Sequence, residues 1–128
     1  MKLLTLWTLL FTLLLSGCSY LNSFWVSSPQ KKIEFQLDQL DTDGLYGPED
    51  GKRSVSYEFC IPGVVEYAQQ VMSIDQTAII YKDSPGRIQC KKYEYLVIGE
   101  TSQPDFKTTL HNLATLDYVT RIVEAHFE

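Results

Sequence analysis

One stretch of the chain alternates without a break between apolar side chains and small or polar ones: Ser54-Val55-Ser56-Tyr57-Glu58-Phe59-Cys60-Ile61. Successive side chains of a β-strand point to opposite faces, so this pattern predicts a strand with Val55, Tyr57, Phe59 and Ile61 in the core. Pro62 and Gly63 follow, and then apolar residues recur at helical spacing as far as residue 72 or 74. This spacing predicts a helix that packs back on the strand.

Alternating strand and helix patterns continue to the end of the chain. Strands are predicted at residues 77–82, 93–99 and 118–127, and a second helix is predicted to start at Pro104. The resulting order over residues 54–128, strand, helix, strand, strand, helix, strand, resembles that of ferredoxin-like (split βαβ) domains. This resemblance implies an α+β fold, a βαββαβ sandwich in which two helices cover one face of a four-stranded antiparallel sheet.

Two segments before the first strand have different patterns. In residues 32–40, apolar and polar residues alternate, which predicts an extra N-terminal edge strand. Residues 41–52 are rich in glycine and acidic residues, which predicts a loop. Asp41 and Asp43 suggest a calcium site, because hard cations favour clustered carboxylates. Their spacing does not match an EF-hand, so a solvated turn is the expectation and calcium the alternative.

The composition limits the size and the partners of the protein. The chain has 128 residues and a formal net charge of -5, which suits a single folded domain, here placed at residues 31–128. Its basic residues are scattered in short pairs. Nucleic acids and anionic surfaces reward clustered lysine and arginine, so no nucleic-acid partner is expected.

The first residues read as a secretory signal. Lys2 precedes an apolar run over residues 3–15, which is shorter than the roughly 20 residues that a membrane-spanning helix needs. The run ends in Leu15-Ser16-Gly17-Cys18, which resembles the lipobox of bacterial lipoproteins. The resemblance implies a signal peptide at residues 1–17, an acylated Cys18 that anchors the protein in membrane lipid, and a tether at residues 18–30.

The same resemblance suggests where the protein resides. Ser19 follows the cysteine, in place of the aspartate that marks inner-membrane retention in many Gram-negative lipoproteins. The expected location is therefore the cell envelope, at the periplasmic side of the outer membrane if the host is Gram-negative.

Cys60 and Cys90 remain once Cys18 is assigned to lipid. An even pair in an oxidising compartment predicts a disulfide. In the ferredoxin-like order the first and third strands are neighbours, which brings the end of the first strand beside the approach to the third. A redox-active pair or a metal site remains an alternative, although the two cysteines are far apart in sequence.

Few residues suggest other chemistry. Glu58 projects from the face of its strand opposite the apolar side chains, Arg87 follows a turn, and His111 lies in the second predicted helix. Both faces of the third strand carry apolar residues, so the open face of the sheet is expected to be covered by residues 33–40, by a second copy or by a partner.

These observations favour a binding module over an enzyme. No nucleophile elbow or phosphate-binding loop is recognisable, and we assign no catalytic residue and no cofactor. The expected partner is an envelope protein or a second copy, bound through the sheet face. The alternative is a small envelope enzyme or a small anionic-ligand binder that uses Glu58, Arg87 and His111.

Overall fold

The computed structural model describes residues 28–127, which form an α+β fold. The expected class, two helices with antiparallel strands, is therefore confirmed. The elements in chain order are the 3-10 helices η1 (Pro29–Lys32) and η2 (Leu37–Gln39), the strands β1 (Leu45–Tyr46), β2 (Arg53–Ser54) and β3 (Ser56–Pro62), the helix α2 (Val65–Ile74), the strands β4 (Ile79–Tyr81) and β5 (Glu94–Glu100), the helix α3 (Phe106–Thr115) and the strand β6 (Val123–Glu124).

The main sheet has the strand order β4-β5-β3-β6, and every neighbouring pair is antiparallel. The longest pairing joins β3 to β5, from Ser56 opposite Glu100 to Pro62 opposite Glu94. The predicted strand at residues 54–61 is therefore a central strand of this sheet from Ser56 onward, with β5 along its whole length on one side and β6 beside Tyr57 and Glu58 on the other, whereas Ser54 belongs to β2. The strands β1 and β2 form a separate two-stranded sheet.

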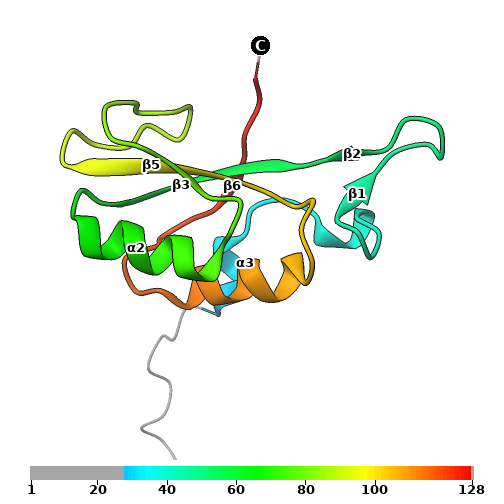
Figure 1. Ribbon diagram of the computed structural model, residues 1–128, viewed down its shortest axis with the longest axis horizontal. Coiled ribbons are helices and arrows are strands. Elements are labelled where there is room, and N and C mark those ends of the chain that lie inside the picture. The colour runs from blue at the N-terminus through cyan, green and yellow to red at the C-terminus, as the bar shows by residue number, and fades with distance from the viewer. Residues whose placement is uncertain (1–27, 128) are drawn as a thin grey trace, which may run out of the picture.

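The helices α2 and α3 lie side by side on one face of the main sheet (Figure 1). The alternation in β3 works as expected, because Tyr57 and Phe59 on the helix side are fully buried. Leu110 and Leu113 of α3 complete the core and are also fully buried. Neither helix in the described part of the chain has the length and the apolar character needed to cross a membrane.

The predicted edge strand at residues 32–40 is wrong. The segment contains the last residue of η1 and all of η2, and among the described residues its β pairing is one parallel bridge between Ile33 and Ile122. Its apolar side chains are partly buried against the core, and the Phe35 ring stacks on Tyr57 at a centroid distance of 6.2 Å. The alternation therefore predicted burial correctly, but it did not predict pairing, because across the described positions the backbone bonds of this segment to the rest of the sheet region are confined to those of Lys32 and Glu34 with Ile122.

Two further expectations need correction. The loop predicted at residues 41–52 contains β1, which pairs with β2 in a short hairpin. The last strand is short, because residues 118–122 pack into the core through Val119 and Ile122 instead of pairing along the sheet. A turn bond from the Val119 N–H to the carbonyl of Leu116 interrupts the alternation.

Candidate functional site

The face of the sheet opposite the helices carries the acidic candidate. Strand pairing places four side chains in one row across this face: Ile79 of β4, Ile98 of β5, Glu58 of β3 and Val123 of β6. Glu58 is therefore a carboxylate set in a mostly apolar row, and it is only 4% exposed. A buried carboxylate needs hydrogen-bond donors, because burial removes the water that would otherwise solvate it.

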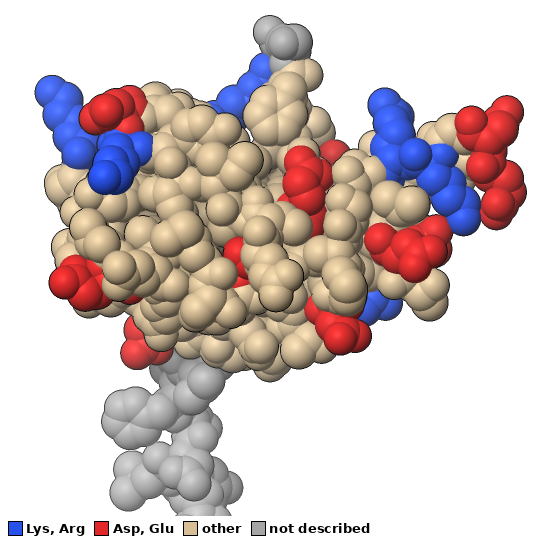
Figure 2. All heavy atoms as spheres, viewed as in Figure 1, with Lys and Arg blue, Asp and Glu red and all other residues tan. Residues whose placement is uncertain are grey.

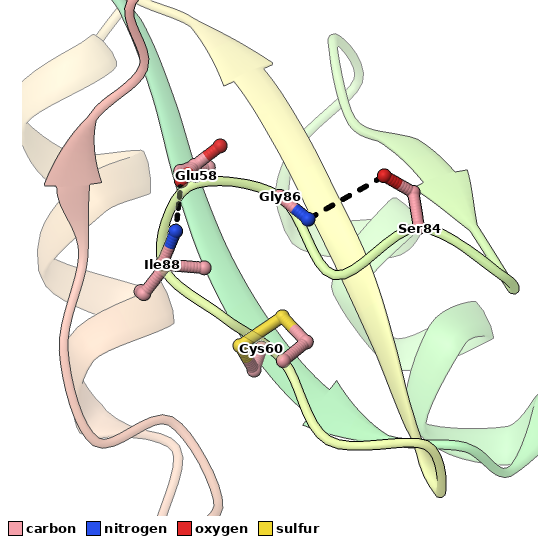
Figure 3. The surroundings of a disulfide bond; sticks show 6 residues. Glu58, Cys60, Ser84, Gly86 and Ile88 are labelled. Carbon is pink, nitrogen blue, oxygen red and sulfur yellow. Dashed lines mark hydrogen bonds between the residues drawn. A yellow bond between two sulfur atoms is a disulfide. The ribbon is translucent and has the colours of Figure 1, made fainter.

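The connection between β4 and β5, residues 82–93, supplies the cover. It crosses the sheet on the side away from the helices, above β5 and β3 (Figure 1). The backbone N–H of Ile88 donates a hydrogen bond to Oε1 of Glu58 at 2.6 Å (Figure 3). Gly86 of the same connection lies against Leu96, which is 2% exposed. The 82–93 connection therefore covers part of this face, in place of residues 33–40, which were one of the expected covers and which lie on the helix side, with Phe35 stacked on Tyr57.

Cys60 and Cys90 form a disulfide, as predicted from the sequence. Their Cα atoms are 5.5 Å apart and their sequence separation is 30. The bond ties the end of the connection to β3, close to the hydrogen bond between Ile88 and Glu58 (Figure 3). Closing a loop of this length stabilises the folded state by about 3.6 kcal/mol in the chain-entropy treatment.

The structure does not bring the three predicted ligand-binding residues together. His111 is exposed on α3, on the helix side of the sheet, whereas Glu58 points to the opposite side. Arg87 is exposed and lies in the connection between Gly86 and Ile88, which both contact Glu58. Glu58 and the segment around Arg87 are neighbours, but His111 is separated from them by the sheet.

Asp41, one of the two possible calcium ligands, is bound by groups of its own loop. Oδ1 of Asp41 accepts hydrogen bonds from the backbone N–H groups of Asp43 and Leu45 at 2.9 and 3.0 Å. Oδ2 forms an ion pair with Lys52 at 3.0 Å. The bond from Leu45 and then the bond from Lys52 lower the pKa of Asp41. This arrangement closes a turn, and Asp43 does not join Asp41 in a metal-binding group within the described residues.

The uncovered part of the same face is an apolar patch on the outermost strand. Ile79 is 56% exposed and Tyr81 is 40% exposed, and both project from β4 beside Ile98 and Leu96 of β5. We call Ile79, Tyr81 and Ile98 the β4 patch. This patch was not predicted from the sequence, although a signal was present: Ile79, Ile80 and Tyr81 are consecutive apolar residues, so the strand has apolar side chains on both faces, and the two helices cover only one of them.

A buried polar cluster lies on the helix side of the main sheet, and it too was not predicted from the sequence. The hydroxyl of Tyr57 donates to Oδ2 of Asp75 at 2.6 Å, and Nε2 of Gln103 donates to Oδ1 of Asp75 at 3.1 Å. Thr77 contributes a backbone and a hydroxyl donor to the same Oδ1. Burial, followed by the charge of Asp75, raises the pKa of Tyr57 well above its ordinary value. The cluster ties the end of α2 to the sheet and is a structural feature.

The described chain thus offers a clamped carboxylate, a disulfide and an exposed apolar edge. In comparisons with known proteins the chain matches no family model, no curated protein and no solved structure.

Proposed function

We propose that this chain is a lipid-anchored protein of the bacterial cell envelope whose folded domain binds a protein partner through the β4 patch. The observation that carries the proposal is the exposure of Ile79 and Tyr81 on the outermost strand. Isolated exposed apolar residues are common on protein surfaces, but adjacent ones along a strand edge are typical of contact surfaces.

The position of β4 suggests how a partner binds. β4 pairs with β5 on one side only, so its other side presents backbone donors and acceptors in strand geometry. An extended segment of a partner can add to such an edge, and its apolar side chains would then rest on the β4 patch. An almost uncharged area of surface lies over α2 and the strands above it, with charged residues at its rim (Figure 2), which favours an apolar contact.

The anchor is proposed from the sequence. Cys18 and the lipobox-like residues before it lie outside the described residues. A disulfide between Cys60 and Cys90 agrees with a compartment that permits disulfides, such as the periplasm in the Gram-negative case. Labelled palmitate should enter the wild-type protein and not the Cys18→Ala variant, and incorporation into the variant would contradict the proposed anchor.

We also infer that the domain belongs to the ferredoxin-like architecture. The support is the element order from β3 to β6, together with the sheet order β4-β5-β3-β6 and both helices on one face. The hairpin β1-β2 and the two 3-10 helices are additions to that plan.

Photo-crosslinking tests the contact surface. A benzophenone amino acid at Tyr81 should give one discrete crosslinked protein in intact cells. The same amino acid at Phe127 is the control, because Phe127 is also an exposed aromatic residue (69%) and follows β6 at the opposite edge of the sheet. Tyr81→Lys should weaken partner binding by about tenfold or more, as expected when one central contact is lost, and Phe127→Lys should leave binding unchanged.

Two outcomes would contradict the proposed surface. One is equal crosslinking at Tyr81 and Phe127, which would indicate chance encounters. The other is a crosslink at Tyr81 that joins two copies of this chain, together with dimers in sedimentation, which would replace the partner by self-association through the same edge.

A further inference from the structure

Three residues around the disulfide have side chains that suit a metal ion. Cys60, Cys90 and Glu94 each offer one ligand atom, and the three atoms lie within 4.8 Å of one another. The sheet register explains this proximity. Cys60 pairs with Leu96, and Glu94 stands two residues earlier on the same face of β5, which makes Cys60 and Glu94 diagonal neighbours across the strands. The disulfide then adds Cys90 to the pair.

The oxidised cysteines cannot act as thiolate ligands, because each sulfur is bonded to the other. A dithiol reductant changes this state: two electrons and two protons convert the disulfide to two thiols, and the dithiol is itself oxidised to a disulfide. Each thiol then releases its proton when it binds a metal. Two thiolates and one carboxylate are ligands that zinc accepts in its four-coordinate sites, with water completing the set.

The distances suit one ion. Two thiolates on a tetrahedral zinc lie about 3.8 Å apart, given zinc–sulfur bonds of about 2.3 Å. The Cα atoms of Cys60 and Cys90 are 5.5 Å apart, so their sulfurs can reach that separation by side-chain rotation alone. Glu94 is partly exposed and starts a strand, which fixes its backbone and leaves its carboxylate able to turn toward the sulfurs.

Solvent reaches the cluster from two sides. A cavity of about 370 Å³ is lined by Cys60, Tyr93 and Glu94 among others. A second cavity, of about 480 Å³, is lined by Cys90, Lys92 and Glu94 among others. Glu94 borders both cavities, so an ion that enters either cavity can reach its carboxylate.

We propose that in the reduced protein Cys60, Cys90 and Glu94 bind one zinc ion, which replaces the disulfide as the clamp that holds the 82–93 connection on the sheet. Zinc would keep the connection over Glu58 when the covalent bond is lost. The site consists of the two cysteines of the disulfide and Glu94 and includes none of the residues of the β4 patch, so this inference stands independently of the proposed partner.

The test uses the domain reduced with a dithiol, freed of the reductant under anaerobic conditions and titrated with Zn²⁺ against a chromophoric chelator. We expect one zinc per chain, and Co²⁺ in its place should give thiolate-to-cobalt absorption. The oxidised protein should bind neither ion. Glu94→Gln should weaken zinc binding by at least about tenfold, whereas Glu66→Gln, a matched change at an exposed position on α2, should not.

A second measurement separates metal binding from folding. Hydrogen exchange at the Ile88 amide, which bonds Glu58, should be slow in the oxidised protein, faster after reduction and slow again with zinc. Three results would each overturn the proposal: no zinc uptake by the reduced chain, equal affinity in Glu94→Gln and the wild type, or zinc uptake that leaves the Ile88 amide exchanging fast.

Discussion

Replacing Gly86 by alanine tests whether the 82–93 connection is packed on the sheet. Gly86 has φ +60°, a conformation that costs a residue with a Cβ atom about 1–2 kcal/mol. An added Cβ would lie 2.7 and 2.9 Å from the two terminal methyl groups of Leu96, and 3.1 Å from Oε2 of Glu58. Leu96 is 2% exposed, so its methyl groups cannot swing into solvent, and such overpacking costs about 1–3 kcal/mol. The expected loss is about 2–5 kcal/mol.

Urea unfolding of the oxidised protein measures this loss. Gly51→Ala is the control, because a Cβ at Gly51 would meet only Cγ of Pro48, at an ordinary 3.7 Å, and its effect should stay within about 0.5 kcal/mol. The Ile88 amide should also exchange faster in Gly86→Ala, because displacing the connection weakens its bond to Glu58. A loss below about 1 kcal/mol with unchanged exchange at Ile88 would refute the close packing described for this face.

Three further predictions concern stability. Replacing Cys60 and Cys90 together by alanine should lower the free energy of unfolding by about 3.6 kcal/mol, and a loss below about 1 kcal/mol in urea titrations would contradict the estimate. Tyr57→Phe should cost about 1.5–3 kcal/mol at neutral pH, because it removes a bond to a buried carboxylate. The raised pKa of Tyr57 means that unfolded chains ionise first, so above about pH 10 the wild type should lose its advantage over this variant by about 1.4 kcal/mol per pH unit; a constant difference would contradict the pKa direction. Phe35→Ala should destabilise the domain by about 1–2 kcal/mol, less than full core burial, because Phe35 is only partly buried; no change in the thermal midpoint would contradict its packing on Tyr57.

The sequence predicted those parts of the fold that depend on side-chain periodicity. The alternation through Tyr57 and Phe59 identified the central strand and its buried face, and both residues are fully buried in the structure. The pairing of Cys60 with Cys90 was also predictable, because the inferred strand order brings their ends together. These signals are local or follow directly from the element order.

Hydrogen bonding between distant segments was not predictable in the same way. Residues 32–40 have the alternation of a strand, but whether they pair with a neighbour depends on a strand edge that is open to them. Within residues 28–127, the bridge to Ile122 is the one β pairing that residues 32–40 form. The contact between the 82–93 connection and Glu58 was unpredictable for the same reason. The turn residues of this connection predict that the chain bends, but they do not predict which part of the sheet it packs on.

The sheet face opposite the helices has a part around Glu58 that the 82–93 connection covers and a part at β4 that is exposed. A carboxylate in the row formed by Ile79, Ile98 and Val123 would be costly without a donor, and the connection supplies one through the N–H of Ile88. The connection, in turn, is held to the sheet by the disulfide and by this hydrogen bond. Glu58 is therefore an anchor for the cover, and any ligand that used its carboxylate would first have to displace the connection. The β4 patch needs no such change, because the side chains of Ile79 and Tyr81 are already exposed. Contact with a partner at the β4 edge would consequently require less reorganisation of the domain than chemistry at Glu58, and this difference is the physical reason for proposing the binding surface there.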